Sequence, residues 1–232
     1  MSVLEIKDLT KDYGKTRALA DVNLSIEAGS IVGLLGPNGS GKTTLIKIIM
    51  GLLSDYEGGA TIDGMRPGHE ANAVISYLPD KAHMPRWLKV NQAIAMFEDF
   101  YKDFDANKAR DMLDAMKIPR DKKIKALSRG MQEKVGLSLT MSRNARLYVL
   151  DEPIGAVDPA SREFIIDTIL KNFSKEGAIL LSTHIIADIE PILDIAVFLK
   201  EGHIVMNEEA DKVREEKGMS LDQLFREVFR NA

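Results

Sequence analysis

The stretch "SIVGLLGPNGSGKTTLIKIIMGLL", residues 30–53, decides how this chain folds. It begins with the continuous apolar run "SIVGLLG", which is typical of a central strand covered on both faces. It continues as "GPNGSGKTT", which matches the pattern G-x-x-x-x-G-K-[ST], and "KTTLIKIIMGLL" then has the spacing and length of a helix. A strand, a glycine-rich loop and a helix in this order predict a phosphate-binding loop.

Each part of that loop has a chemical reason. Gly36, Gly39 and Gly41 let the backbone curl, so that successive N–H groups point at the β- and γ-phosphates. Lys42 adds a positive charge there, and Thr43 offers a hydroxyl to Mg²⁺. The residues expected to bind the nucleotide from this loop are Gly36, Pro37, Asn38, Gly39, Ser40, Gly41, Lys42, Thr43 and Thr44.

A second motif, "RLYVLDEP" at residues 146–153, has two carboxylates at the end of an apolar strand. We expect Asp151 to hold Mg²⁺ through water, and Glu152 to act as the general base on the attacking water. Together with the phosphate loop, this motif predicts hydrolysis of a nucleoside triphosphate. No N-K-x-D segment for reading guanine is present, and Tyr13 in "KDYGK" either stacks on the base or is an exposed turn residue.

Composition limits the remaining possibilities. The chain has 232 residues with 45% apolar content, enough for one large domain or a domain with a subdomain. Its net charge of −4 argues against a nucleic-acid-binding face as the main function, and the lack of cysteine excludes disulfides. The N-terminus does not resemble a signal peptide, and no apolar run approaches the roughly 20 residues of a membrane span. We therefore expect a cytoplasmic protein.

The remaining segments predict an α/β fold. Residues 3–9 and 22–27 alternate like half-buried strands, whereas residues 84–143 carry three amphipathic, methionine-rich segments. We expect a P-loop NTPase core with a mixed sheet, an N-terminal antiparallel β part and an inserted helical subdomain at about 84–143. Residues 1–207 would form the ATPase domain and 208–232 a C-terminal helical extension. Ser220 and Gln223 have the spacing of a capping box before the last helix, which would pack on its own core or on a second protomer.

The stretch "KALSRGMQEK", residues 125–134, places a serine at the start of a helix and is a second candidate anion site. With it, the order of motifs resembles the nucleotide-binding subunit of an ATP-binding-cassette (ABC) transporter of the bacterial exporter type. The resemblance covers roughly residues 2–207. The matching pieces are Tyr13, "GPNGSGKTT", "SYLPD", "LSRGMQ", "LYVLDEP", "GAVD" and "LLSTH".

That resemblance implies a role for each further motif. Two such chains would pair head to tail, so that Ser128 and Gly130 of one contact the γ-phosphate held by Lys42 of the other. His184 would reach the γ-phosphate as a switch residue, Asp158 would touch the opposite protomer, and Tyr13 would stack on adenine. Asp80 stands where the family usually has glutamine, which touches Mg²⁺ and the attacking water; here Asp80 would be a tighter metal ligand, make a slower catalyst, or be displaced from the site.

The resemblance also implies partners. The chain would dock under a separate transmembrane permease subunit at the inner face of the membrane, and pair with a second ABC ATPase chain, identical or related. Met84, Trp87 and Phe97 are docking candidates, or else belong to the core of the helical subdomain. We expect ATP and Mg²⁺ as ligands and no nucleic acid. The alternatives are a soluble cassette ATPase acting on nucleic acid or ribosomes, and a regulatory cassette that does not hydrolyse ATP.

Overall fold

The computed structural model describes residues 2–80, 84–155 and 157–230. Its centre is a six-stranded sheet in the order β5-β6-β7-β3-β8-β9, in which the first five strands are parallel and β9 is antiparallel to β8. The strands are β3 Ile31–Leu35, β5 Ile75–Leu78, β6 Leu147–Asp151, β7 Ala178–Thr183, β8 Ile195–Lys200 and β9 His203–Glu209. All residues of β3, β6 and β7 are buried, as their continuous apolar runs predict.

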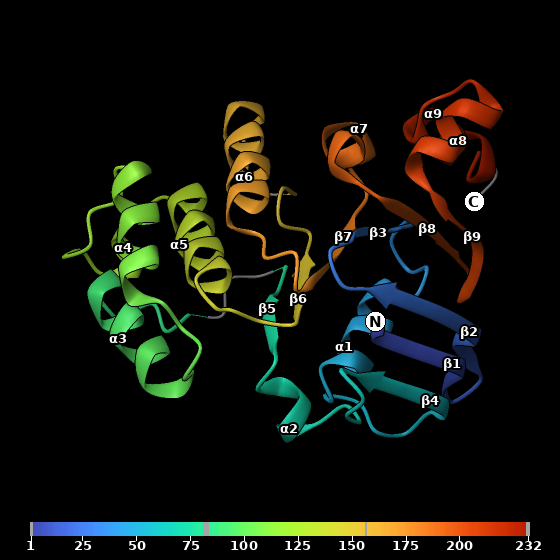
Figure 1. Cartoon of the computed structure of the whole chain (residues 1–232), viewed down its shortest axis with the longest axis horizontal. Helices are drawn as coiled ribbons and strands as arrows, with labels where there is room; N and C mark the ends of the chain where they lie inside the picture. The colour runs from blue at the N-terminus through green and yellow to red at the C-terminus, as the bar shows by residue number, and fades with distance from the viewer. Residues whose placement is uncertain (1, 81–83, 156, 231–232) are drawn as a thin grey trace.

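A second, three-stranded antiparallel sheet lies beside the first in the order β2-β1-β4 (Figure 1). Its strands are β1 Ser2–Tyr13, β2 Thr16–Glu27 and β4 Glu57–Ile62. Strands β1 and β2 are longer than the predicted ranges, because their pairing continues to a tight turn between Tyr13 and Thr16. Helix α1 Lys42–Ile49 buries Leu45, Ile46, Ile48 and Ile49 in the apolar cluster that joins the two sheets. The predicted mixed sheet and antiparallel β part are confirmed.

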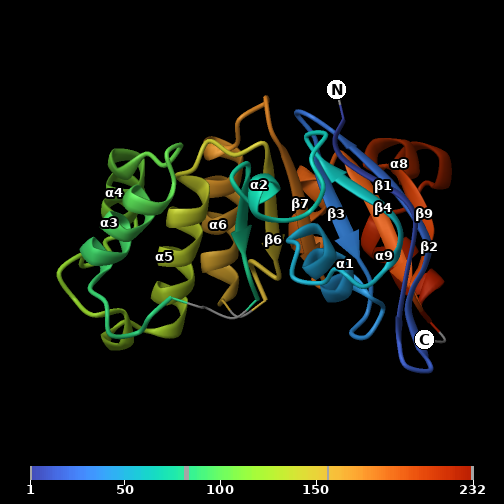
Figure 2. The same ribbon diagram turned by 90° about the horizontal axis from the view of Figure 1, so that it is seen from below.

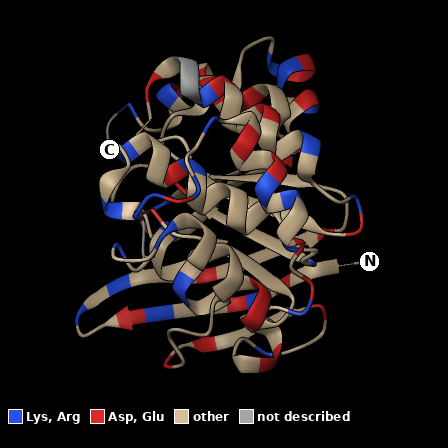
Figure 3. Ribbon diagram, turned by 90° about the vertical axis from the view of Figure 1, so that its left-hand side faces the viewer, with Lys and Arg blue, Asp and Glu red and all other residues tan. Residues whose placement is uncertain are grey.

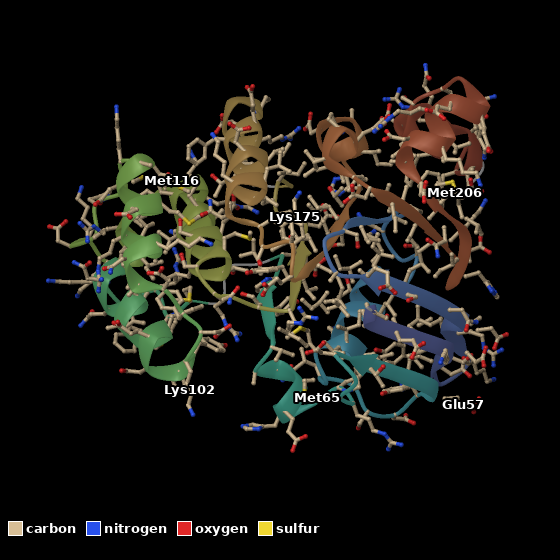
Figure 4. All side chains as sticks on the ribbon, in the orientation of Figure 1. Glu57, Met65, Lys102, Met116, Lys175 and Met206 are labelled. Atoms are coloured by element: carbon tan, nitrogen blue, oxygen red, sulfur yellow. The ribbon has the colours of Figure 1, made fainter. Side chains whose placement is uncertain are left out.

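Three helices form the separate helical part at one end of the molecule (Figures 1 and 2). They are α3 Val90–Phe100, α4 Ala106–Ala115 and α5 Arg129–Met141, and they enclose their own apolar cluster. Met116, between α4 and α5 (Figure 4), packs against both this cluster and that of the main sheet. Arg143 fixes the helical part to β5, because its buried guanidinium pairs with Asp103 and donates to the carbonyl of Ile75.

The remaining helices cover the face of the large sheet opposite α1: α6 Pro159–Asn172, α7 Ile186–Ile189, α8 Ala210–Lys217 and α9 Leu221–Val228. The short elements are α2 His69–Asn72 and the 3₁₀ turns Ile124–Ala126 and Glu190–Ile192. The capping box of Ser220 and Gln223 is present, and α9 packs on the chain's own core through Leu221 and Leu224.

Two features of the C-terminal half differ from, or extend, the sequence predictions. Strand β9 had not been predicted, and the expected domain boundary at residue 207 falls inside it, since its pairing with β8 extends to Glu209.

Within the described residues, no helix combines the length and the apolar composition needed to cross a bilayer.

Candidate active site

The phosphate loop joins β3 to α1 and can be built only with glycine at two positions. Gly41 has a φ of 113°, and a Cβ there would lie 2.6 Å from the carbonyl oxygen of Ala18. A Cβ on Gly36 would lie 2.4 Å from the carbonyl oxygen of Leu199. Both contacts are with backbone that cannot move aside, so the loop passes closer to the adjoining strands than any side chain would allow.

Lys42 lies at the start of α1 and is almost fully buried, with its Nζ donating to the carbonyl oxygens of Gly36 (2.6 Å) and Pro37 (3.1 Å). Burial lowers the pKa of Lys42, while the nearby Glu152 and Asp151 act in the opposite direction. Ser40 Oγ, in the same loop, is buried and has no hydrogen-bond partner in the described part of the chain. A bound phosphate would therefore accept a hydrogen bond from Ser40 Oγ, which now lacks a partner, and from Lys42 Nζ, which now bonds to the loop itself.

A pocket of about 340 Å³ lies over the loop and has the size of a small-molecule site. It brings together most of the predicted site residues: it is lined by Tyr13, Ala18, Asn38, Gly39, Gly41, Lys42, Thr43, Thr44, Asp80, Asp151 and Glu152. The ring of Tyr13 is half exposed at the end of β1, with Lys11 Nζ 5.0 Å from its centroid. Strands from both sheets thus contribute to one cavity.

Asp151 ends β6 and is buried at the base of the pocket. It accepts a hydrogen bond from the Ser182 hydroxyl at the end of β7. Burial raises the pKa of Asp151, the Ser182 bond lowers it, and the neighbouring Asp80 and Glu152 raise it further. The positive charge of Lys42 acts in the opposite direction and lowers this pKa.

Glu152 follows directly and has a φ of 52°, in the left-handed region that glutamate rarely adopts. Its backbone N–H donates to the carbonyl oxygen of Ser182 (2.9 Å), which holds this conformation. Its carboxylate accepts from Thr183 Oγ1 (3.2 Å) and lies 3.0 Å from Nδ1 of His184. Strained backbone of this kind is found where a side chain must be aimed, and here Glu152 is aimed at the pocket.

His184 is half exposed, and its described partner is Glu152. The resemblance predicted that His184 contacts the γ-phosphate. In the structure it lies beside the carboxylate of Glu152, which would act on the attacking water. Sequence reasoning missed Ser182 and Thr183, which hydrogen-bond to the two acidic residues. Their signal was visible in "LLSTH": two hydroxyl residues end a buried strand that lies next to β6.

Asp80 follows β5 and lines the phosphate pocket, so it is not displaced from the site. With Asp151 it also acts on Tyr77: burial, followed by these two negative charges, raises the pKa of that phenol to about 12. Three carboxylates, those of Asp80, Asp151 and Glu152, therefore border the cavity that contains Lys42.

The second candidate anion site lies elsewhere. Ser128 is the N-cap of α5 and accepts from the N–H of Met131 (3.3 Å), and both Ser128 and Arg129 are exposed. A Cβ on Gly130 would meet no atom within 4 Å. Neither Ser128 nor Gly130 lines the phosphate pocket, and neither does Asp158, which is exposed just before α6. Ala156 of "GAVD" and residues 81–83 of the predicted docking segment lie outside the described residues.

Comparison with known proteins agrees with this geometry. The sequence model of the ABC transporter family matches residues 19–155, more than half of the chain. The ATP-binding protein LptB of the lipopolysaccharide export system of Escherichia coli is 31% identical over 219 residues, which are 88% of this chain and 90% of LptB.

Solved structures share the whole fold. An ATP-binding subunit of an ABC transporter has a TM-score of 0.89 at 28% identity, covering 98% of this chain and 99% of that one. The cassette MJ0796, solved as a dimer in a post-hydrolysis state with ADP and Pi, has a TM-score of 0.77 at 24% identity, covering 89% and 98%. With the phosphate pocket, these matches lead to one conclusion: the chain belongs to the ABC transporter family and is an ATP-binding, ATP-hydrolysing subunit of that family.

Proposed function

We propose that this subunit powers a membrane exporter through a dimer that encloses ATP between two copies of the cassette. In each pocket, Lys42 and the N–H groups of the phosphate loop hold the phosphates, and Tyr13 stacks on the base. The observation that carries the proposal is the separation of two anion sites: the pocket holds Tyr13, Lys42 and most of the phosphate loop, whereas the turn at Ser128 lies outside it and is exposed.

Glu152 is the general base in this proposal. It takes a proton from the water that attacks the γ-phosphorus, the bond to the β-γ bridging oxygen breaks, and ADP and phosphate are released. Support comes from its place on the pocket wall and from the side chains that orient it, Thr183 and His184. His184 would move from Glu152 towards the γ-phosphate when nucleotide is bound.

Magnesium fits the donors present. Thr43, Asp80 and Asp151 offer hard oxygen ligands around one cavity. Among the described residues, no group of three or more His, Asp or Glu forms a complete protein cage for a metal. That suits Mg²⁺, which keeps phosphate and water among its ligands and would offset charge on the phosphates.

The dimer is proposed because the turn at Ser128 is exposed and lies outside the phosphate pocket of its own chain. Its hydroxyl, the N–H groups of the first turn of α5 and Gly130 would meet the γ-phosphate of the other protomer. Asp158 would lie at the same interface. The dimeric state of MJ0796, with which this chain shares its fold, supports the arrangement.

The permease partner is proposed from the family and from a groove between the helical part and the core. Met84 is buried in the helical cluster and Phe97 packs against it, so of the three docking candidates only Trp87 is well exposed. A cavity of about 160 Å³ between β5 and α3 is lined by Phe97, and the buried Oδ1 of Asn72, which also lines it, has no partner among the described residues. The likeness to LptB, which serves an export system, supports the direction of transport.

We keep the expected division of the chain as part of this proposal. Residues 1–207 would form the ATPase domain, 84–143 its helical subdomain, and 208–232 an extension that adds stability to the face opposite α1.

The dimer is tested with Glu152→Gln, which removes the base and should trap an ATP-dependent dimer visible by size-exclusion chromatography. Adding Ser128→Asp keeps a good helix cap but sets a negative charge against the γ-phosphate, and should abolish the dimer without weakening ATP binding to the monomer. Ser220→Asp is the matched control, because Ser220 caps α9 in the same way and lies outside the site. A persistent dimer in the Ser128→Asp background would refute the head-to-tail arrangement.

The transport role is tested by purifying the tagged chain from its source membranes in mild detergent. A polytopic membrane protein in stoichiometric amount supports the permease assignment, and a second cassette chain in that complex would identify a heterodimer. Ribosomes, nucleic acid or soluble partners alone would overturn it. Reconstituted in vesicles, an exporter complex should move its substrate away from the side that holds the ATPase.

A further inference from the structure

Two segments far apart in the sequence pair at the outer edge of the helical part. Residues 85–89 precede α3, and residues 120–125 belong to the connection between α4 and α5, seen at the lower left of Figure 2. The Ile124 N–H donates to the Leu88 carbonyl (2.8 Å), and the Lys125 N–H to that of Arg86 (2.9 Å). Lys89 and Lys123 lie directly opposite one another in antiparallel register.

The paired segments have two different faces. Leu88 and Ile124 point inward and are buried in the helical cluster, at 7% and 2% exposure. Most of their neighbours in the two segments are instead exposed to solvent. This outward face, which we call the basic face, consists of Arg86, Trp87, Lys89, Lys122, Lys123 and Lys125, all exposed.

Positive charges predominate in the two segments, although Arg86 and Lys125 line a cavity together with the carboxylates of Asp80 and Glu133. None of the lysines of the basic face, nor Arg86, makes an ion pair with a described residue, whereas the nearby Arg120 and Arg129 pair with Asp114 and Glu133. Asp121 is the acidic residue within the two segments. Elsewhere at this end of the molecule, basic and acidic residues are interspersed (Figure 3). Lys89 and Lys123 face each other across an isolated bridge, and an external anion would reduce the repulsion between these two like charges.

Trp87 indicates which anion fits. It is the only tryptophan of the chain, and 67% of it is exposed in the middle of these cations. An indole among lysines is the composition of surfaces that rest on the polar region of a membrane, where the ring lies at headgroup level and the cations meet lipid phosphates. Because the overall charge is −4, electrostatic attraction to a polyanion would have to come from a local basic surface such as this face.

We propose that the basic face binds anionic phospholipid headgroups directly, and so holds this ATPase against the membrane independently of any permease contact. The inference does not depend on the ATP-sandwiched dimer, because the residues that carry it lie outside the phosphate pocket. It assigns Trp87, left without a role by the fold of the helical part, to the boundary between protein and lipid.

The single tryptophan makes the test direct, since all indole fluorescence comes from Trp87. We expect a blue shift and quenching by brominated acyl chains when the full chain meets vesicles of phosphatidylcholine mixed with phosphatidylglycerol. Pure phosphatidylcholine vesicles should give neither, and high salt should reverse both. Replacing two cations, in Lys89→Ser/Lys123→Ser, should weaken vesicle binding about 30-fold.

The matched control is Lys175→Ser/Lys217→Ser, which removes two exposed lysines that likewise make no ion pair with a described residue and lie outside the basic face. It loses the same net charge and should bind vesicles like the parent. Equal loss in both double variants, or no blue shift with anionic vesicles, would overturn the proposal. So would equally strong binding of DNA or polyglutamate under the same conditions, since the face would then be a general polyanion site. Both double variants should keep the parental ATPase rate in solution, which shows that they are folded.

Discussion

The phosphate loop and the turn at Ser128 both place backbone N–H groups at the start of a helix, yet they are built in opposite ways. The loop is enclosed by strands of both sheets, its Gly36 and Gly41 are required by close backbone contacts, and its lysine is buried. The turn at Ser128 is exposed, its glycine has open space around it, and its cap is satisfied by its own helix. The phosphate loop lies in a pocket formed within the chain, whereas the turn at Ser128 presents an open surface. The comparison shows that helix starts with similar N–H groups can lie in a pocket or on an open surface suited to an interface. Burial distinguishes the two.

The largest effect should come from the enclosed site. Glu152→Gln should lower ATP turnover at least about 100-fold, because the base is lost while the phosphate contacts stay. ADP release and equilibrium nucleotide binding measure the two properties separately. Glu215→Gln, an exposed glutamate on α8, is the control. Turnover at the parental rate would show that Glu152 is not the base.

A pair of glycine variants compares the two sites directly. Gly41→Ala should destabilise the fold by about 1–3 kcal/mol and weaken ATP binding, because its φ of 113° and the Ala18 carbonyl exclude a Cβ. Gly130→Ala should leave the melting temperature and ATP binding of the monomer nearly unchanged, since no atom lies within 4 Å of the added Cβ. Equal losses in the two variants would contradict the contrast between enclosed and open sites.

A smaller change is expected from Asp80→Gln. The substitution removes one of three carboxylates around the pocket and thereby reduces repulsion of the phosphates, so basal hydrolysis should stay the same or rise. Steady-state ATPase assays at saturating Mg²⁺ measure it, with Asp99→Asn on the exposed side of α3 as the control. Total loss of activity would instead mean that Asp80 is an essential ligand.

The smallest effect should come from the open turn. Arg129→Ala removes an exposed ion pair with Glu133 and should cost only about 0.3–0.5 kcal/mol, measured by thermal unfolding. Lys171→Ala is matched to it, because Lys171 pairs with Asp167 at the same helical spacing. A loss of several kcal/mol at Arg129 alone would mean that the turn is more rigid than its exposure indicates.

Much of the fold could be predicted because its signals are local. The buried strands of the large sheet are continuous apolar runs, and the helical part is a change of periodicity over residues 84–143. Strand β9 escaped prediction because its burial alternates between half-buried and exposed, as expected of an edge strand, and its partner is set by the sheet. Whether α9 packs on its own core depended likewise on contacts with α7 and β8 that no local pattern encodes.

The sequence by itself determined the chemistry of the phosphate loop and of the two acidic residues at the end of β6. Each of these motifs lies within a dozen residues, and the functional groups of its side chains and backbone indicate what it binds. Only the tertiary structure decided that Asp80 faces the pocket, that Ser182 and Thr183 orient the two carboxylates, and that Lys89 meets Lys123. These relations join residues from different strands and loops. They depend on which strands become neighbours, and that is set by burial of the whole core rather than by any one segment.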